Sequence, residues 1–336
     1  MDGIFLRVGE LLFMKPISIH LQAYAKINFS LDVLEKRQDG FHNIRSIMQS
    51  ISLYDRLSLT KTEGDISIEC ADPEVPCNDN NLAVRGAQEL KQAAQVKAGV
   101  HIVLSKGIPV AAGLGGGSAD VAAVLRGLNN LWNTGLDNRE LREIGKRIGA
   151  DVPFCLTGGT ALAEGIGEVL TPLEDFPRLW LVLFKPAFGV STPEVYRAHD
   201  RMERVQYRQD TEAVLAGVEK GDFEAMISGM GNMLQQITTG LYPEVGNIIH
   251  MLQKKALTKV FMCGSGPTVC AVVSDRCAAE ELRRQCFAFS GKVYITHTVP
   301  RASILLDGYK RGEKVGGKEA YANKTGKLQA LAGNCL

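Results

Sequence analysis

The sequence predicts an α+β fold divided into two domains, and three observations lead to this prediction. Short runs in which apolar and polar residues alternate are typical of half-buried strands. Helical stretches lie between these runs, but the first half lacks the regular strand–helix–strand repeat of a doubly wound sheet. The chain has 336 residues, of which 45% are hydrophobic, so it is long enough for two hydrophobic cores at roughly 150 residues per domain.

In the first half, alternation starts at Ile17, Ile19 and Leu21 and predicts a strand that continues to Leu34. The turn signal Glu63-Gly64-Asp65 predicts a hairpin between strands at 57–59 and 66–68. The other expected elements are a strand at 47–53, a helix at 82–95, a strand at 100–104, a helix after the glycine-rich segment 109–117, and a helix over 137–148 that begins at Asp137.

Glycine and proline become frequent between residues 165 and 178, and we place a domain boundary there. The elements expected after it are a buried strand at 179–184, helices within 193–232 and at 243–256, strands at 259–263, 268–273 and 292–298, and a helix at 277–287. We therefore expect an N-terminal extension over 1–17, a first domain over 18–166, a second domain over 167–306, and a disordered tail over 307–336.

Composition excludes several classes of protein. The formal net charge of +1 gives no electrostatic reason to expect nucleic acid or a membrane surface as a partner. No apolar stretch approaches the roughly 18 residues of a spanning helix, and the start of the chain lacks the basic residues and cleavage site of a signal peptide. Eight cysteines occur without a C-x-x-C pair, which favours reduced thiols in a cytoplasmic protein. Met14 is a candidate for the true start.

The strongest motif is the segment PVAAGLGGGSA at residues 109–119, between a predicted strand and a predicted helix. Glycine allows positive φ and close approach of a ligand, and free N–H groups at a helix start attract anions. A Walker loop is excluded because no lysine follows the glycines, and Ser118 replaces the third glycine of a dinucleotide fingerprint. The segment predicts a phosphate site of another type; the alternative is a glycine-rich connector without a ligand.

The pattern P-x-x-x-G-L-G-G-G-S-A closely resembles the phosphate loop of the GHMP kinases. Its triple glycine is most similar to the branch that acts on 4-diphosphocytidyl-2-C-methyl-D-erythritol. The resemblance implies a two-domain GHMP kinase fold, with a ribosomal protein S5 domain 2-like, ATP-binding N-terminal domain and a ferredoxin-like C-terminal domain.

Three further segments resemble motifs of the same branch and occur in the same order. They are Ala25-Lys26-Ile27-Asn28 followed by Arg37-x-Asp39-Gly40-Phe41-His42, then Gly149-Ala150-Asp151-Val152-Pro153-Phe154, and finally Gly264-Ser265-Gly266-Pro267-Thr268. Together the four matches extend over residues 18–305. A single glycine-rich loop is a weak signal, whereas four ordered motifs are a strong one.

For catalysis, the resemblance implies that Asp151 is the general base and that Lys26 pairs with it beside the attacking hydroxyl. Taken alone, Asp151 is compatible with a helix N-cap, and Lys26 with a solvated lysine on an exposed strand face. Phosphoryl transfer requires an in-line hydroxyl, neutralised charge and often a carboxylate that takes the proton, which fits the implied roles.

For ATP, the resemblance implies a site made by the phosphate loop, with less specific matches at Asn81 and Lys106 near the adenine. Ser118 is a candidate contact for Mg²⁺, although no metal site is expected from the protein alone, and helix capping is its alternative role. Asp120 is expected to make only a favourable contact with the helix dipole. The implied ATP-binding residues are Asn81, Lys106, Pro109, Val110, Ala111, Ala112, Gly113, Leu114, Gly115, Gly116, Gly117, Ser118 and Ala119.

For the second substrate, the resemblance implies a cytosine ring held between Phe41 and Tyr196, with His42 reading its edge. Many family members have tyrosine at the first position and phenylalanine at the second, so this chain has the two aromatics exchanged; stacking needs only the ring faces. Taken alone, the aromatics are compatible with core packing and His42 with a turn. Other implied substrate-binding residues are Asn28, Asp151 and Thr192.

The function implied is ATP-dependent phosphorylation of the 2-hydroxyl of 4-diphosphocytidyl-2-C-methyl-D-erythritol, in the non-mevalonate route to isoprenoid and terpenoid precursors. We expect ATP and Mg²⁺ as cofactors and a monomer or weak homodimer. Another GHMP kinase, for mevalonate or homoserine, is the alternative enzyme, and a regulatory module without catalysis is the alternative from another class.

Overall fold

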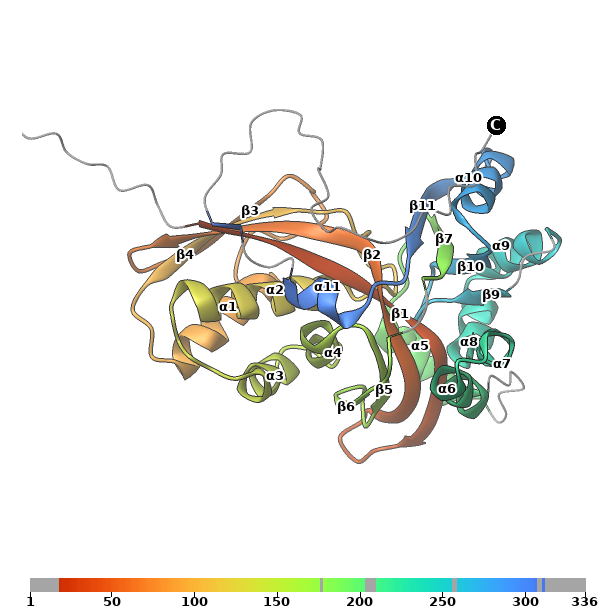
Figure 1. The fold of residues 1–336 in the computed structure, drawn as a ribbon, viewed down its shortest axis with the longest axis horizontal. Helices are drawn as coiled ribbons and strands as arrows, with labels where there is room; N and C mark the ends of the chain where they lie inside the picture. The colour runs from red at the N-terminus through yellow and green to blue at the C-terminus, as the bar shows by residue number, and fades with distance from the viewer. Residues whose placement is uncertain (1–17, 176–177, 203–209, 256–258, 307–309, 312–336) are drawn as a thin grey trace, which may run out of the picture.

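The computed structural model describes residues 18–175, 178–202, 210–255, 259–306 and 310–311 (Figure 1). The expected N-terminal extension over 1–17 and most of the expected tail over 307–336 lie outside these residues.

A long antiparallel pair of strands forms the backbone of the first sheet. Strand β1 (Ser18–Lys36) pairs with β2 (His42–Thr62) along nearly its whole length, from the pair Ser18–Thr60 to the pair Lys36–His42. The period-two alternation predicted β1 well, whereas β2 is one continuous strand rather than two short ones. The two strands join at a tight turn, which carries residues 37–41.

The hairpin expected around Glu63-Gly64-Asp65 is wrong. Strand β3 (Ile66–Cys70) pairs in parallel with β4 (Gly99–Ser105), and β4 lies between β3 and β2. The chain returns through helix α1 (Leu82–Ala93), so β3, α1 and β4 form a β–α–β unit. The connection through α1 places β3 beside β4, so the local turn signal does not determine the partner of β3.

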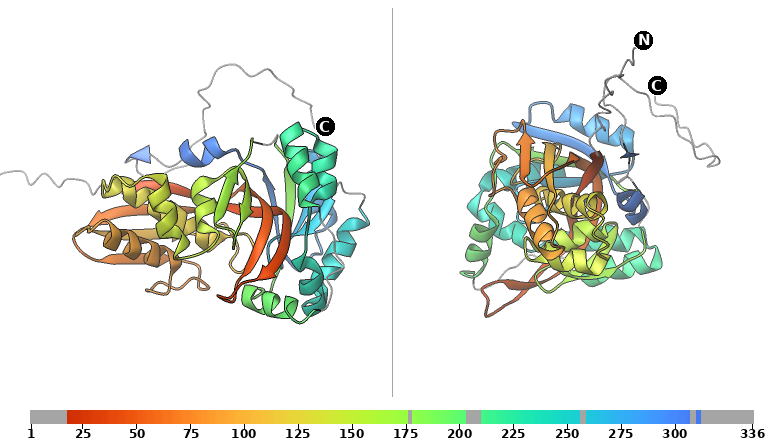
Figure 2. Two further views of the ribbon diagram at one scale, coloured as in Figure 1. Left: turned by 90° about the horizontal axis from the view of Figure 1, so that it is seen from below. Right: turned by 90° about the vertical axis from the view of Figure 1, so that its left-hand side faces the viewer.

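Four helices, α1 to α4, lie on one side of this sheet (Figures 1 and 2). Helix α2 (Gly116–Leu131) is the most buried of them, with no exposed surface at Val121, Val124 or Leu128. Helix α3 (Asn138–Lys146) begins at the expected Asp137, which forms a capping box with Glu140. The short helix α4 (Val152–Thr157) was not predicted.

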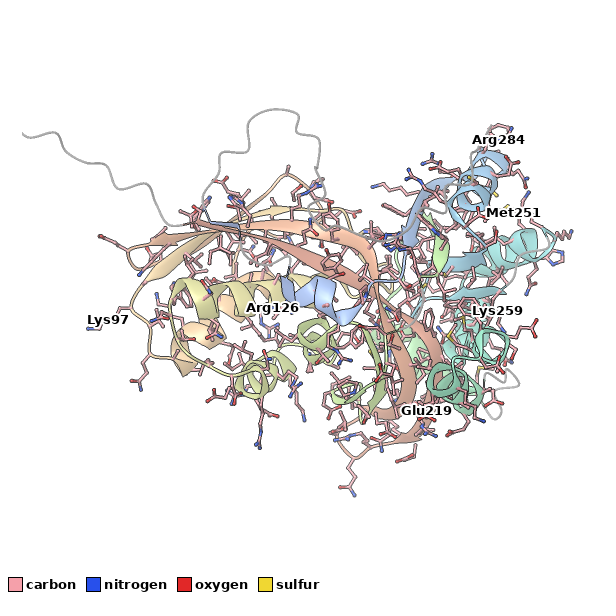
Figure 3. The ribbon with its side chains drawn as sticks, in the orientation of Figure 1. Lys97, Arg126, Glu219, Met251, Lys259 and Arg284 are labelled. Carbon is pink, nitrogen blue, oxygen red and sulfur yellow. The ribbon has the colours of Figure 1, made fainter. Side chains whose placement is uncertain are left out.

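Shorter strands and one helix complete the first domain. Strand β5 (Thr160–Glu164) pairs with β2 and with β6 (Val169–Pro172), so the first sheet continues past residue 166, where we expected the first domain to end. Lys310–Arg311, within the segment expected to be a disordered tail, forms β12 and pairs with β1. Helix α11 (Arg301–Leu306) also returns to this domain, where Arg126 of α2 donates to the Ile304 carbonyl oxygen at 2.8 Å (Figure 3).

The second sheet consists of four antiparallel strands in the order β11-β7-β10-β9. In chain order the domain runs strand, helices, strand, strand, helix, strand, which is the ferredoxin-like arrangement. Its strands are β7 (Trp180–Pro186), β9 (Lys259–Met262), β10 (Val269–Val273) and β11 (Gly291–His297), and its helices are α5 (Thr192–His199), α6 (Thr211–Lys220), α7 (Phe223–Gly229), α8 (Leu234–Leu241), α9 (Pro243–Gln253) and α10 (Arg276–Gln285).

The two domains are joined by a buried asparagine. Strand β8 (Gly231–Asn232) lies between α7 and α8 in sequence and pairs in parallel with β1. The Asn232 side chain has no exposed surface and donates to the carbonyl oxygens of Met262 and Gly264, at 2.8 and 2.6 Å. This arrangement fixes the turn after β9 against β1. Among the described helices, none has the length and apolarity needed to cross a bilayer.

Candidate active site

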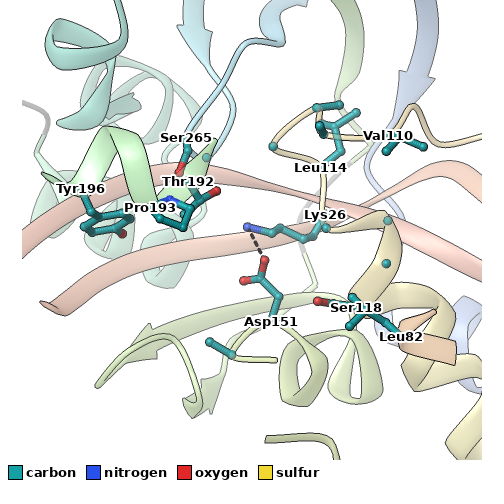
Figure 4. Close-up of a pocket in the computed structure, with 18 of the residues that line it drawn as sticks. Lys26, Leu82, Val110, Leu114, Ser118, Asp151, Thr192, Pro193, Tyr196 and Ser265 are labelled. Atoms are coloured by element: carbon teal, nitrogen blue, oxygen red, sulfur yellow. Dashed lines mark ion pairs between the residues drawn. The ribbon is translucent and has the colours of Figure 1, made fainter. Parts of the chain in front are cut away.

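A cavity of about 880 Å³ lies where the two domains meet, and the predicted site residues converge on it (Figure 4). Ala119 is the exception, since it is buried in α2 and does not line the cavity. The predicted residues that do line the cavity are Lys26, Asn28, Phe41, His42, Asn81, Lys106, Pro109, Val110, Ala111, Ala112, Gly113, Leu114, Gly115, Gly116, Gly117, Ser118, Asp151, Thr192 and Tyr196.

Two positions of the glycine-rich loop require glycine because of their backbone conformation and their close neighbours. Gly113 and Gly115 have φ of +76° and +69°, in the left-handed region that side chains disfavour. A Cβ at Gly113 would lie 2.3 Å from the carbonyl oxygen of Cys263, and a Cβ at Gly115 would lie 2.8 Å from Cγ of Lys26. The loop therefore touches both the turn after β9 and the Lys26 side chain, and α2 starts directly after it at Gly116, with its free N–H groups at the cavity.

Lys26 and Asp151 form an ion pair at the centre of the cavity (Figure 4). The distance from Nζ of Lys26 to Oδ2 of Asp151 is 3.2 Å, and Nζ also donates to Oδ1 of Asn28 at 3.1 Å. Lys26 is 5% exposed, which rules out a solvated lysine. Asp151 occupies the N-cap position of α4, but its side chain makes no capping hydrogen bond and pairs with Lys26 instead. About a third of the Asp151 side chain, 31%, is exposed.

The last of the four motifs, Gly264–Thr268, supplies Ser265 to the cavity wall. In Figure 4, Lys26 lies between the α5 residues Thr192, Pro193 and Tyr196 on one side and Ser118 on the other. A Cβ at Gly149 would lie 3.5 Å from the Ser118 hydroxyl oxygen, so Ser118 also lies close to the loop that carries Asp151. The phosphate loop and the predicted base are thus neighbours.

At the end of the cavity away from the phosphate loop, three rings come from three parts of the chain: Phe41 from the turn between β1 and β2, His42 from β2, and Tyr196 from α5. The ring centroids of His42 and Tyr196 are 5.3 Å apart, with planes tilted by 33°. Burial raises the pKa of Tyr196 well above its usual value, and the charge of Asp151 adds to this effect. Phe41 is 58% exposed at the tip between β1 and β2, which excludes core packing as its role. His42 is 6% exposed and belongs to β2 rather than to a turn.

Lys106 belongs to a buried group of charges that sequence reasoning did not find. Its Nζ contacts both Oδ2 of Asp55 and, at 2.9 Å, Oδ2 of Asp120. Asp55 also accepts hydrogen bonds from the backbone N–H groups of Gly107 and Ile108, at 2.6 and 2.8 Å, and so holds the segment that leads into the phosphate loop. The expectation that Asp120 contacts only the helix dipole is wrong, because its carboxylate is ion-paired and 4% exposed.

Burial and opposite charges compete within this group. Burial alone would lower the pKa of Lys106, but Asp120 and Asp55 outweigh it and the pKa is raised. Burial and the charge of Asp55 raise the pKa of Asp120, against the opposing effect of Lys106. Lys106 therefore stays charged. It forms ion pairs with both carboxylates and also lines the cavity.

Asn81 has a structural role that the motif comparison did not reveal. Its Oδ1 accepts from the backbone N–H of Ala83 at 2.8 Å and caps α1, while its Nδ2 donates to the Pro76 carbonyl oxygen at 2.8 Å. The side chain thus fixes the loop before α1 against the helix start, at the rim of the cavity.

Two unpredicted residues, Lys36 and Asp200, also line the cavity beside His42. Asp200 follows Tyr196 by four residues, a spacing that places both on the same face at the end of α5. That spacing is the signal which could have identified Asp200 once Tyr196 was assigned.

Comparison with known proteins agrees with this geometry. Residues 81–159 match the model of the GHMP kinases N terminal domain, and residues 214–291 match the model of the GHMP kinases C terminal region. A 4-diphosphocytidyl-2-C-methyl-D-erythritol kinase of Clostridium botulinum is 40% identical over 281 residues, which are 84% of this chain and 100% of the relative. The enzyme of the same name from Bacillus cytotoxicus is 44% identical over 286 residues, covering 85% of this chain and 98% of the relative.

The chain belongs to the 4-diphosphocytidyl-2-C-methyl-D-erythritol kinase family. A solved structure of a 4-(cytidine 5'-diphospho)-2C-methyl-D-erythritol kinase agrees in fold, with a TM-score of 0.71, 33% identity, and coverage of 83% of this chain and 98% of that one. The GHMP kinase fold expected from the four motifs is thereby confirmed. The N-terminal family match begins at Asn81 and includes both the phosphate loop and Asp151.

Proposed function

We propose that this protein transfers the γ-phosphoryl group of ATP to the 2-hydroxyl of 4-diphosphocytidyl-2-C-methyl-D-erythritol. The observation that carries the proposal is the Lys26–Asp151 pair, which lies in one cavity between a glycine-rich helix start and a cluster of rings. Family membership at 40–44% identity over most of the chain supports the same reaction. Mevalonate or homoserine as the acceptor would not account for the cluster of Phe41, His42 and Tyr196 at the other end of the cavity.

In this reaction Asp151 accepts the proton of the attacking hydroxyl. Its Oδ2 is held by Lys26, and its partial exposure to the cavity leaves room for a substrate oxygen. Lys26 is in turn fixed by Asn28, whose Nδ2 donates to the Ser46 hydroxyl oxygen at 2.7 Å. The buried ammonium group stabilises the negative charge that develops on the hydroxyl oxygen as it attacks.

The phosphate loop binds the nucleotide through backbone N–H groups at the start of α2 rather than through a loop lysine. The site offers oxygen donors at Ser118 and Asp151, the donor type that Mg²⁺ prefers, so these residues fit a nucleotide-bound Mg²⁺ with Ser118 as its expected contact. When bound, the ion would neutralise charge on the phosphates. Lys106 and Asn81 form the wall at the adenine end.

At the other end, Phe41 and Tyr196 stack on the two faces of the cytosine ring and His42 hydrogen-bonds its edge. Because Phe41 is exposed, its ring can move over a ligand at a small cost in free energy, whereas Tyr196 is fixed by its contact with His42. The exchange of the two aromatics keeps both ring faces. A monomeric or weakly dimeric state and a cytoplasmic location stay predictions.

The proposed function is tested by ADP release from the purified protein with Mg·ATP, offered in turn 4-diphosphocytidyl-2-C-methyl-D-erythritol, mevalonate and homoserine. Turnover is expected with the cytidyl substrate alone. Turnover with mevalonate or homoserine instead would contradict the cytosine assignment of Phe41, His42 and Tyr196. Binding of ATP without turnover of any acceptor would contradict catalysis and favour the regulatory module.

Replacing Gly115 with alanine is expected to lower kcat about tenfold and to cost about 1–2 kcal/mol of stability. The stability cost comes from the left-handed φ of +69°, and the rate effect comes from the new methyl group, which would displace Lys26 from Asp151. Steady-state kinetics and urea unfolding measure the two effects.

The matched control is Gly135→Ala, because Gly135 has a φ of +73° and nothing within 4 Å of a new Cβ. It should show the same stability cost with unchanged kcat. Equal kcat values in the two variants would mean that Gly115 does not position Lys26.

A further inference from the structure

The ring of His42 is held by a carboxylate. Its Nε2 lies 2.6 Å from Oδ1 of Asp200, at the end of α5, and the two residues are 158 positions apart in sequence. An ionised carboxylate only accepts hydrogen bonds, so Nε2 must carry a proton in this contact. In the neutral ring, the other nitrogen, Nδ1, then has a lone pair and acts as an acceptor.

Asp200 is itself kept ionised and oriented. Its second oxygen, Oδ2, accepts from Nζ of Lys36 at the end of β1. The hydrogen bond from Lys36 lowers the pKa of Asp200, and the contact with His42 lowers it further. Lys36, Asp200 and His42 therefore form one chain of charge-assisted contacts along the cavity wall.

Neighbouring rings restrict rotation of the imidazole. Tyr196 packs against it at 5.3 Å, and His199 meets it edge to face at 5.4 Å with the ring planes at 86°. Among the described residues, the hydrogen bonds of His42 all involve Nε2, so Nδ1 is the nitrogen left for a ligand. The ring is thus fixed both in its plane and in its tautomer.

A fixed acceptor distinguishes the two common pyrimidines. Cytosine carries a 4-amino group, which donates, whereas uracil carries a 4-oxo group, which accepts and would face the Nδ1 lone pair. We propose that Asp200, held by Lys36, fixes the Nε2–H tautomer of His42 and so makes the cavity select a 4-aminopyrimidine over a 4-oxopyrimidine. Asp200 is then a positioning residue that acts through His42, and this inference rests on the proposed function for its substrate.

The test variant is Asp200→Asn, because an asparagine keeps the shape but can turn its amide and donate to Nε2, which permits the opposite tautomer. The measurements are kcat/KM for 4-diphosphocytidyl-2-C-methyl-D-erythritol and for its uridyl analogue, and the affinities for CDP and UDP by calorimetry. The cytidyl-to-uridyl ratio is expected to fall about tenfold in the variant, mainly through KM, with the KM for ATP unchanged.

Two further variants complete the design. Lys36→Met leaves the carboxylate in place but removes its cation, and a smaller fall in the same ratio is expected. Glu281→Gln is the control, since it removes an exposed, ion-paired carboxylate of α10 away from the cavity and should leave the ratio unchanged.

The tautomer is observed directly from the ¹⁵N shifts of the His42 ring, assigned with a His42→Gln variant. The wild type is expected to carry its proton on Nε2 alone. A proton on Nδ1, or equal losses for cytidyl and uridyl substrates in Asp200→Asn, would overturn the inference. Preference for CDP over UDP without turnover of the cytidyl substrate would contradict the proposed function and leave the inference intact.

Discussion

Replacement of Asp151 by asparagine is expected to lower kcat about 10³-fold while the KM for ATP stays nearly unchanged. Asparagine has the same shape, so it keeps the neighbourhood of Lys26, but it cannot take a proton from the substrate hydroxyl. General-base catalysis typically contributes about 10²–10⁴-fold, and an interaction made only in the transition state affects kcat rather than binding. Steady-state kinetics with both substrates varied measures the effect.

The control is Asp79→Asn, the same chemical change at an exposed residue that bonds Gln88 and does not line the cavity. It should retain full activity. If Asp151→Asn keeps kcat within about tenfold of the wild type, catalysis rests on positioning and on Lys26, and Asp151 is not the base.

Replacement of Lys106 by methionine is expected to cost about 3–5 kcal/mol of the free energy of unfolding at neutral pH. The change leaves the Asp55 and Asp120 carboxylates buried without their cation, and removal of one partner from a buried ion pair is strongly destabilising. One oxygen of Asp120, Oδ1, is already buried without a hydrogen-bond partner among the described residues. Urea unfolding measures the loss.

The dependence of this loss on pH has a definite sign. The folded-state pKa of Asp120 lies above its unfolded value, so the stability gained by protonation is fully present below the unfolded pKa and is lost as pH rises through the folded pKa. Removal of Lys106 also removes the effect that opposes this rise, so the Lys106→Met protein gains more stability from protonation of Asp120 than the wild type does, and its deficit should shrink as pH falls toward about 4. The control Lys36→Met removes an exposed partner and should cost about 0–1 kcal/mol. Equal losses in the two variants would contradict the buried-charge argument.

Sequence periodicity predicted elements whose apolar pattern is local. Strand β1 and helices α1 and α9 appear close to their expected bounds, because one face of each is buried along most of its length. The pairing of β3 was predicted wrongly, since a turn signal carries no information about which strand the crossover helix brings alongside. The short elements α4, β5 and β6 have too few residues to show a period.

Some residues of the candidate site could likewise be predicted from the sequence, and others could not. Lys26 and Asp151 were predicted because each belongs to a motif with its own sequence pattern, and the structure brings them within 3.2 Å of each other. Asp55, Asp120 and Asp200 were missed as functional neighbours because their partners lie elsewhere in the chain and each aspartate alone resembles an ordinary cap or surface charge. Their importance follows from burial and pairing, which only the folded chain defines.

The long pair β1 and β2 has a consequence for the length of the substrate. The same pair of strands holds Lys26 at the phosphate loop and His42 at the ring cluster: Lys26 of β1 lies opposite Ser50, and His42 of β2 lies opposite Lys36, with two register shifts in the ladder between these pairs. An extended strand rises by a fixed amount of about 3.3 Å per residue, so the separation of the two ends is set by a residue count. If the substrate binds as proposed, with its base at the ring cluster and its hydroxyl at Asp151, the paired strands set the length that its diphosphate linker must have.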